Sequence, residues 1–253
     1  MSIHPTALID SNASIDPSVV IGPYTVIGPG VTIGMGTIIG PHVTIEQNTI
    51  IGNNVSIHTG AILGADPQDR LYDGRETWLE IGEESIIREY AVIARGSTDK
   101  TVIGSKVLVM SHTHIAHDCN IGTGAVISNN STVLDHVTMG DYSMIGANTF
   151  VNRNCRTGNL SFIGGGSRVH IDIPPFVIAG DEPLQITAIN NVAMQKFGFS
   201  EDDIATVQKI YLLWNTLKPD IETAIERFNT EYPENGIVSD IVSFYQSASR
   251  GVI

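Results

Sequence analysis

The sequence predicts an all-β protein, a triangular parallel β-helix followed by a C-terminal α-helical tail. Two observations indicate the β-helix: an aliphatic residue recurs at every sixth position, and a small residue follows each aliphatic by four places. A period of six fits neither a helix, with 3.6 residues per turn, nor a strand, with a period of two, but it fits a short strand followed by a turn. The third observation is helical spacing of apolar residues after residue 200, which indicates the tail.

The aliphatic column occupies residues 3–63 and 81–93, and after a shift of four residues it continues through 103–169, broken only by Thr157. In a strand, the small residue and the aliphatic two places later point inward, and the residue between them points outward. Three such units would form one coil of 18 residues, and stacked coils would share a continuous core.

We expect the β-helix to span residues 1–175, with loops at 64–80 and 96–100 where the repeat is interrupted. The Ile-Pro-Pro-Phe run at 173–176 is expected to end the strands, because proline cannot donate to a ladder. Residues 176–253 are expected to form a connector and a helical domain. Its helices would start after the N-cap Ser200, at Pro219 and near Ile237.

The net charge of −13 argues against nucleic-acid binding and against adhesion to anionic membranes. No signal peptide or run of 18 apolar residues is recognisable, so we expect a cytoplasmic protein without stable membrane insertion. Cys119 and Cys155 both fall in the inward column of small residues, and we expect them to be buried core thiols.

Titratable residues are concentrated in Ser111–Asn120, which contains three histidines and an aspartate. His114 lies between two inward positions and should face outward, whereas His117 and Asp118 should lie at a corner. His136 follows Asp118 by 18 residues. Because stacked coils are about 4.8 Å apart, we expect these four side chains to share one exposed patch. A histidine beside a carboxylate is typical of a general base, and a cluster of histidines could also bind a metal.

Several motifs resemble the UDP-N-acetylglucosamine O-acyltransferase family of lipid A biosynthesis, and the resemblance covers essentially the whole chain. The matching motifs are the hexads, Pro-Gln-Asp at 67–69, His-Ile-Ala-His-Asp-Cys at 114–119, Asp-Ile-Pro-Pro-Phe at 172–176, Gly-Phe-Ser at 198–200 and Ser-Arg-Gly at 249–251. The hexads alone would be a weak signal, because many acyltransferases share them.

The resemblance implies a left-handed β-helix that forms a homotrimer with active sites between subunits. It implies transfer of a (3-hydroxy)acyl group from acyl carrier protein to the 3-position of UDP-N-acetylglucosamine, without a cofactor or metal. His117 would be the general base and Asp118 would orient it. Substrate contacts would come from His114, His136, Asn152, Arg153, Asn190 and Lys196, and from Gln68 and Asp69 of the long loop of a neighbouring subunit.

The sequence departs from the family pattern at five positions: Leu71, Ala94, Asp135, Asn152 and Phe197. Asp135 stands where the family has a glycine whose backbone N–H binds the oxyanion, so the N–H of Asp135 would take this role. Phe197 replaces one of two arginines. These departures favour an altered nucleotide or sugar specificity, and the alternative is a related N- or O-acyltransferase acting on a different nucleotide amino sugar.

An acidic carrier protein requires a local basic patch, which Arg153, Arg156, Arg168 and Lys196 are expected to supply. A zinc enzyme of the γ-carbonic anhydrase type is a weaker alternative on the same fold. Its ligands would be His112, His117 and Glu76, although Glu76 lies in a loop. A purely structural solenoid would leave the outward histidines and the long loop unexplained.

Overall fold

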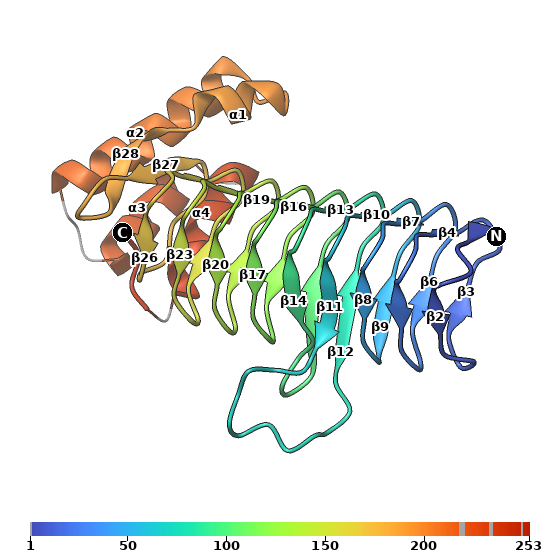
Figure 1. Cartoon of the computed structure of the whole chain (residues 1–253). Helices are drawn as coiled ribbons and strands as arrows, with labels where there is room; N and C mark the ends of the chain where they lie inside the picture. Colours follow the sequence, from blue (N-terminus) through green and yellow to red (C-terminus); the bar gives the residue numbers. More distant parts are fainter. Residues whose placement is uncertain (1, 218–220, 233–234, 249) are drawn as a thin grey trace.

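The computed structural model describes residues 2–217, 221–232, 235–248 and 250–253. The chain winds as a parallel β-helix whose three faces are three sheets, and the helices gather at its C-terminal end (Figure 1). The predicted hexapeptide-repeat fold and helical tail are therefore confirmed.

The strands are two to five residues long, and we name the sheets A, B and C. Sheet A contains β1 (Ser2–Ile3), β4 (Val20–Ile21), β7 (Ile38–Ile39), β10 (Ser56–Ile57), β13 (Ile86–Ile87), β16 (Leu108–Val109), β19 (Val126–Ile127), β22 (Met144–Ile145), β25 (Phe162–Ile163), β27 (Val177–Gly180) and β28 (Gln185–Ile189). Sheet B contains β2 (Leu8–Ile9), β5 (Val26–Ile27), β8 (Thr44–Ile45), β11 (Ile62–Ala65), β14 (Val92–Ala94), β17 (His114–Ile115), β20 (Thr132–Val133), β23 (Phe150–Val151) and β26 (Arg168–Val169). Sheet C contains β3 (Ser14–Ile15), β6 (Thr32–Ile33), β9 (Thr49–Ile51), β12 (Trp78–Ile81), β15 (Lys100–Ile103), β18 (Asn120–Ile121), β21 (Thr138–Met139) and β24 (Arg156–Thr157).

The strand register follows the 18-residue coil. Val20 pairs with Ile38, and His114 pairs with Thr132. Across the long loop Ile62 pairs with Val92, and the shorter insertion falls within the coil that separates Val92 from His114. Both insertions leave the helix at the corner that joins sheet B to sheet C, which we call the B–C corner. The long one forms the segment that projects from the shaft between β11 and β12 (Figure 1).

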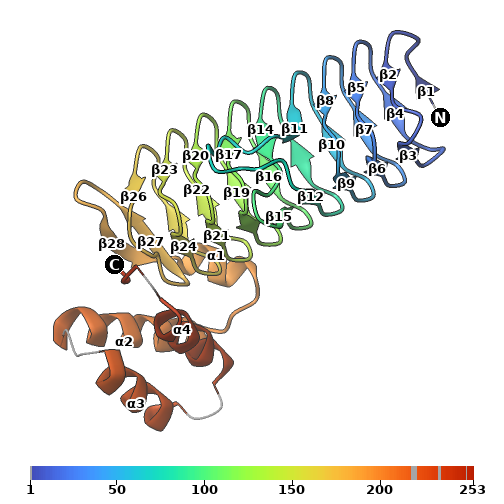
Figure 2. The same ribbon diagram turned by 90° about the horizontal axis from the view of Figure 1, so that it is seen from below.

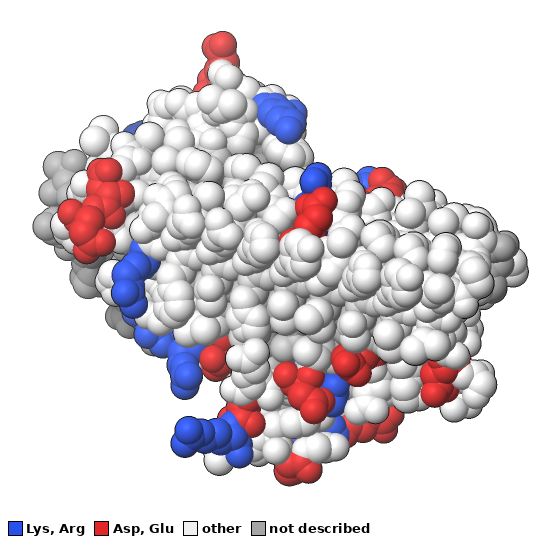
Figure 3. Space-filling view, in the orientation of Figure 1, with Lys and Arg blue, Asp and Glu red and all other residues white. Residues whose placement is uncertain are grey.

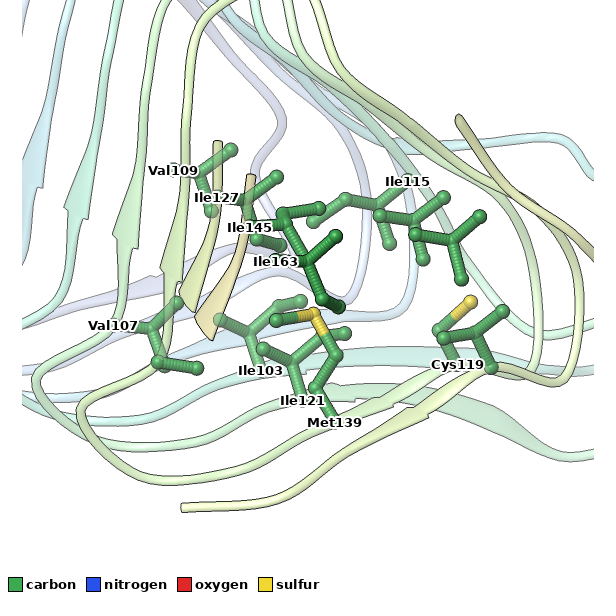
Figure 4. Packing of buried hydrophobic residues seen from close by; sticks show 14 of the residues in the cluster. Ile103, Val107, Val109, Ile115, Cys119, Ile121, Ile127, Met139, Ile145 and Ile163 are labelled. Carbon is green, nitrogen blue, oxygen red and sulfur yellow. The ribbon is translucent and has the colours of Figure 1, made fainter. Parts of the chain in front are cut away.

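The inward columns form the core. Ile103, Ile121 and Met139 stack on one another in successive coils of sheet C, and Cys119 lies beside Ile115 (Figure 4). Cys119 and Cys155 are both buried, as expected, and burial raises the pKa of the Cys119 thiol to about 12. Thr157, the break in the column, is also buried, and its hydroxyl forms a hydrogen bond with that of Ser143.

The prediction that strands end at the proline pair is wrong. The prolines occupy a corner, Phe176 adopts the positive φ of 65° found at corners, and β27 then pairs in parallel with β25. β28 returns antiparallel to β27, so sheet A continues beyond residue 175.

Four helices follow in the described ranges, and the short first one was not predicted from the sequence. They are α1 (Asn191–Lys196), α2 (Glu201–Leu217), α3 (Ile221–Glu231) and α4 (Gly236–Gln246). Helices α2, α3 and α4 form a layer beside the last coils (Figure 2). The predicted cap of α2 is present, because the Ser200 hydroxyl accepts from the N–H of Asp203 and the Asp203 carboxylate accepts from the N–H of Ser200. Pro219 lies outside the described residues, and so does Ser249.

The C-terminal residues return to the last coil. The N–H of Asp172 donates to Gly251 and its carbonyl accepts from Ile253. Tyr211 of α2 donates its hydroxyl to the carbonyl of Pro175. Among the helices of the described residues, none has the length and apolar character needed to cross a bilayer.

Candidate active site

His117 and Asp118 form a hydrogen-bonded pair at the B–C corner between β17 and β18. Nδ1 of His117 lies 2.8 Å from Oδ2 of Asp118. Asp118 has a φ of 57°, the left-handed conformation that recurs at the second residue of the corners. Nε2 of His117 has no hydrogen-bonding partner among the residues that the structure describes, so it is the ring atom left for a substrate proton.

The pair is buried, so the prediction that His117 and Asp118 lie in an exposed patch is wrong. His117 is 8% exposed and the Asp118 side chain 6%. The insertion that follows β14 accounts for the burial of Asp118, because its backbone closes over the carboxylate. The periodicity of the sequence correctly predicts that His117 lies outside the core of the β-helix, but it does not show which residues cover the side chain.

Asp118 accepts hydrogen bonds from three consecutive backbone N–H groups, those of Ser97, Thr98 and Asp99, at 3.1 to 3.3 Å. The Thr98 hydroxyl donates a further bond of 3.1 Å. Burial alone would raise the pKa of Asp118, but the hydrogen bonds from His117 and from the backbone outweigh it and lower the pKa below its usual value. Asp118 is therefore ionised at neutral pH.

His136, on the next coil, completes the group. Its Nε2 lies 3.8 Å from Oδ2 of Asp118, and its ring meets that of His117 edge to face, with centroids 5.7 Å apart. His136 is exposed, so it borders the solvent side of the pair. The expected meeting of His117, Asp118 and His136 is observed.

His114 does not join this group. It lies on the outer face of β17, where its imidazole ring makes no hydrogen bond or ion pair with any described residue. Burial lowers the pKa of His114 below its ordinary value of 6.5, so the ring is neutral at pH 7.

The long loop approaches the same corner of its own chain. Oδ2 of Asp69 accepts from the Ser97 hydroxyl at 3.3 Å, and Gln68 beside it is exposed. Asp69 therefore lies beside the turn that covers Asp118 in its own chain, and its contact with a sugar bound to a neighbouring subunit stays a prediction.

Arg95 anchors this loop and was not singled out from the sequence. Its side chain is 4% exposed; Nη1 donates to the carbonyl of Gly64, and Nη2 binds Asp66 and the Tyr72 hydroxyl. Nε of Arg95 is buried and has no hydrogen-bond partner among the described residues. Ser97, Thr98 and Asp99 were likewise missed, although an insertion directly before the His117 coil was a signal.

Asp135 lies one coil above His117 at the same corner. Its backbone N–H has no acceptor among the described residues, which leaves it available to a ligand. Its carboxylate lies 3.7 Å from Nε of Arg153, whose side chain is 66% exposed. Asn152 precedes this arginine, so both expected contact residues stand near the site.

Asn190 and Lys196 lie on a different face of the chain. They border a groove of about 490 Å³ between α1 and the outer face of sheet A, together with Lys106, Tyr142 and Phe162. Phe197, at the position of a family arginine, packs on Tyr142 with ring centroids 4.2 Å apart. One chain alone does not bring these residues to His117.

Arg156 is not free to dock a partner, which corrects that expectation. Its guanidinium pairs with the buried Asp172 at 3.0 Å and donates to Ser247 and to the carbonyl of Phe244. It therefore fastens α4 to the last coils. Arg168 is exposed above the ring of Phe150, at 5.4 Å from the ring centroid.

The histidines do not assemble the carbonic anhydrase ligand set. His112 lies at another corner, where it stacks on Tyr90, and Glu76 is exposed in the loop. His117, Asp118 and His136 do place ligand atoms within 4.8 Å of one another. Both Asp118 oxygens, however, already accept several hydrogen bonds, so the geometry suits an oriented base better than a metal ligand.

Comparisons with known proteins identify the family of the chain. Residues 172–253 match the family model described as UDP N-acetylglucosamine O-acyltransferase, domain 2, and residues 1–34 and 100–135 match the bacterial transferase hexapeptide model. The chain is 38% identical to the acyl-[acyl-carrier-protein]–UDP-N-acetylglucosamine O-acyltransferase of Anaeromyxobacter dehalogenans, over 100% of this chain and 99% of that protein. It is 34% identical to the enzyme of the same name from Xylella fastidiosa, over 75% and 74% of the two chains.

Solved structures give the same result. The UDP-N-acetylglucosamine O-acyltransferase of Moraxella catarrhalis superposes with a TM-score of 0.96 at 33% identity, over 100% of both chains. The UDP-N-acetylglucosamine acyltransferase of Bacteroides fragilis gives a TM-score of 0.96 at 34% identity, over 99% of both chains. The chain belongs to the acyl-[acyl-carrier-protein]–UDP-N-acetylglucosamine O-acyltransferase family.

Proposed function

We propose that this protein transfers a (3-hydroxy)acyl group from acyl carrier protein to the 3-hydroxyl of UDP-N-acetylglucosamine, an early step of lipid A biosynthesis. The observation that carries the proposal is the buried His117–Asp118 pair, whose Nε2 is unpartnered among the described residues. The names of relatives with 33 to 38% identity support the substrate class.

The pair performs general-base catalysis. The sugar hydroxyl attacks the thioester carbonyl, and Nε2 of His117 removes its proton while Nδ1–H stays bound to Asp118. The ionised carboxylate stabilises the imidazolium that forms, as in other histidine–carboxylate pairs. When the tetrahedral intermediate collapses and the C–S bond breaks, the His117 imidazolium gives this proton to the departing thiolate of the carrier, so no cofactor is required.

The oxyanion of that intermediate binds to the backbone N–H of Asp135. The N–H is unpartnered within the described part of the chain, and the carboxylate faces Arg153. An anion beside a developing oxyanion would slow the reaction, and the arginine draws that anion away.

The active protein is a cytoplasmic homotrimer. Asn190 and Lys196 lie on another face than His117, so a second subunit is needed to bring the two sets together. Exposed aliphatic residues on sheets A and B favour such an assembly: Leu8, Val20, Val26, Ile38, Ile62 and Ile86.

The carrier protein docks near the C-terminal end of the β-helix. Arg153 and Arg168 are exposed there, Lys196 is exposed beside the groove at α1, and Arg156 is engaged internally. Figure 3 shows basic side chains toward this end of the shaft and few charges along its middle. A local basic surface steers an acidic partner despite the overall negative charge.

Specificity for a different nucleotide sugar is the second candidate. Phe197 offers an aromatic ring on Tyr142 where the family has a cation, and Leu71 is 88% exposed at the loop. Substrate contacts with the diphosphate or the sugar would change at these two positions.

The deciding experiment incubates the protein with acyl-carrier thioesters of several chain lengths and a panel of UDP- and dTDP-sugars, with products read by mass spectrometry. We expect O-acylated UDP-N-acetylglucosamine from the wild type, and its formation about 10²–10⁴ times more slowly from His117→Gln. Acylation of an amine on another nucleotide sugar would favour the second candidate, and the absence of any acylated product would refute both.

A further inference from the structure

The turn between β14 and β15 lies outside the hexapeptide repeat and surrounds the Asp118 carboxylate with hydrogen-bond donors. Three consecutive N–H groups, from Ser97, Thr98 and Asp99, converge on the Asp118 carboxylate with the Thr98 hydroxyl. No other carboxylate in the described ranges accepts from three consecutive N–H groups. Converging backbone N–H groups form a concave site for an anion, in this case a side chain of the same protein.

The turn has a tight backbone that keeps these donors in place. A Cβ on Gly96 would lie 2.5 Å from the nitrogen of Lys100 and 2.6 Å from the carbonyl carbon of Asp99. Non-bonded contacts of Cβ atoms are essentially never this short, so any side chain at residue 96 would displace the backbone of the turn. Glycine is therefore required here by close backbone approach.

The donors hold the two carboxylate oxygens differently. Oδ1 accepts from the N–H groups of Ser97, Thr98 and Asp99, whereas Oδ2 shares the N–H of Ser97 and faces Nδ1 of His117. With the carboxylate held in this way, Oδ2 always presents an acceptor to Nδ1. The proton of neutral His117 then resides on Nδ1 and Nε2 remains the base.

The turn is connected to the substrate loop as well. The Ser97 hydroxyl donates to Asp69, and the same residue's N–H donates to Asp118. One buried residue thus joins a loop carboxylate to the carboxylate of the catalytic pair.

We propose that the turn Ser97–Asp99 is a positioning element of the active site, which fixes the Asp118 carboxylate toward His117 and so selects the Nδ1–H tautomer of the base. This inference rests on the proposed function for its kinetic consequence, whereas the tautomer itself is independent of any substrate. Ser97, Thr98 and Asp99 are positioning residues, since they act through Asp118.

Two variants perturb the turn to different degrees. Gly96→Ala displaces all three backbone donors, and Thr98→Val removes only the hydroxyl donor at nearly constant volume. Matched controls are Gly236→Ala, where an added Cβ meets nothing within 4 Å, and Thr32→Val on the outer face of β6, where the hydroxyl has no partner among the described residues.

The first readout is the ¹⁵N spectrum of histidine-labelled protein, with the His117 signals assigned by their loss in His117→Gln. The wild type and both controls should show His117 with its proton on Nδ1. Gly96→Ala should show a substantial share of the Nε2–H tautomer, and Thr98→Val a smaller share that Thr98→Ser abolishes.

The second readout is steady-state kinetics. We expect kcat to fall roughly three- to tenfold in Thr98→Val and further in Gly96→Ala, with KM unchanged, because one charge-assisted hydrogen bond corresponds to about a tenfold effect. A wild-type His117 with its proton on Nε2 would overturn the proposal, and so would a folded Gly96→Ala with unchanged tautomer and kcat. If Gly96→Ala does not fold, an unchanged Thr98→Val overturns it. If the tautomers are as predicted but the wild type shows no acyl transfer, the proposed function is refuted and the positioning role of the turn is retained.

Discussion

Asp118→Asn is the most informative single substitution, because it changes a charge and an acceptor without changing shape. The three N–H groups of Ser97–Asp99 point at the carboxylate from one side. The remaining amide oxygen must therefore face them, which directs the new NH₂ group toward Nδ1 of His117, at the 2.8 Å contact. Nδ1 then has to accept, and the proton moves to Nε2, the atom that should take the proton of the sugar hydroxyl.

The size of the effect follows from the wrong tautomer. In Ser-His-Asp triads the same replacement lowers kcat by about 10⁴, and we expect a fall of about 10³–10⁴ here. The amide also meets the N–H of Ser97 as a second donor. The loss of the charged acceptor should lower the free energy of unfolding by about 1.5–3 kcal/mol.

The assay measures initial rates of acyl transfer by mass spectrometry and urea unfolding for the wild type and the variant. Asp10→Asn is the matched control, since Asp10 also accepts a backbone N–H, from Asn12, but at a distant corner. The control should retain wild-type kcat. A kcat for Asp118→Asn within tenfold of the wild type would refute the role of Asp118 in fixing the base.

Four further outcomes are expected. His117→Gln should lower kcat by about 10²–10⁴ while circular dichroism remains unchanged, and a retained kcat would exclude His117 as the base. Because the folded-state pKa of Asp118 lies below its ordinary value of 3.8, its ionised form stabilises the fold above pH 3.8, and this contribution is lost as the pH falls through the lower pKa. The difference in unfolding free energy between wild type and Asp118→Asn should therefore shrink below pH 3.8, and a constant difference would contradict it. Arg95→Met should release the long loop, which should raise KM for the nucleotide sugar and make the loop susceptible to proteolysis. A loop that resists the protease as well as in the wild type would contradict the anchoring role of Arg95. Arg156→Met removes the cation that pairs with the buried Asp172 and should lower the free energy of unfolding in urea by about 3–5 kcal/mol, with kcat unchanged. A variant as stable as the wild type would show that Arg156 does not anchor α4.

The fold was predictable because the repeat records it directly. A side chain that recurs every sixth residue can only stack if the chain turns after each short strand, so the core columns, the buried thiols and the outward corner of His117 followed from position alone. The proline pair was misleading, since proline is excluded from ladders but accepted at corners, and β27 starts immediately after one.

The site was predictable only in part. The 18-residue spacing brought Asp118 and His136 together, because it is also the spacing of the coils. The burial of the pair and the hydrogen bonds to Asp118 depend on the path of an irregular turn. A periodic pattern contains no information about that path. Asn190 and Lys196 depend on the path of the connector after β28, which was beyond the reach of the pattern.

Because stacked positions in the regular part of the repeat are 18 residues apart, the β-helix can gain or lose length only in steps of one complete coil without disturbing its edges. Removal of one complete coil ahead of the site would shorten the shaft by about 4.8 Å and return every later side chain to its own edge. Removal of a single hexad between the second insertion and His117 would instead rotate everything that follows by a third of a revolution, so His117 would move to an edge that the two insertions do not cover. Insertions of any length are harmless only where they leave and re-enter at one corner, as those before β12 and β15 do. Substrate-facing loops can therefore lengthen or shorten in such a protein while the catalytic residues stay on the same edge of the β-helix.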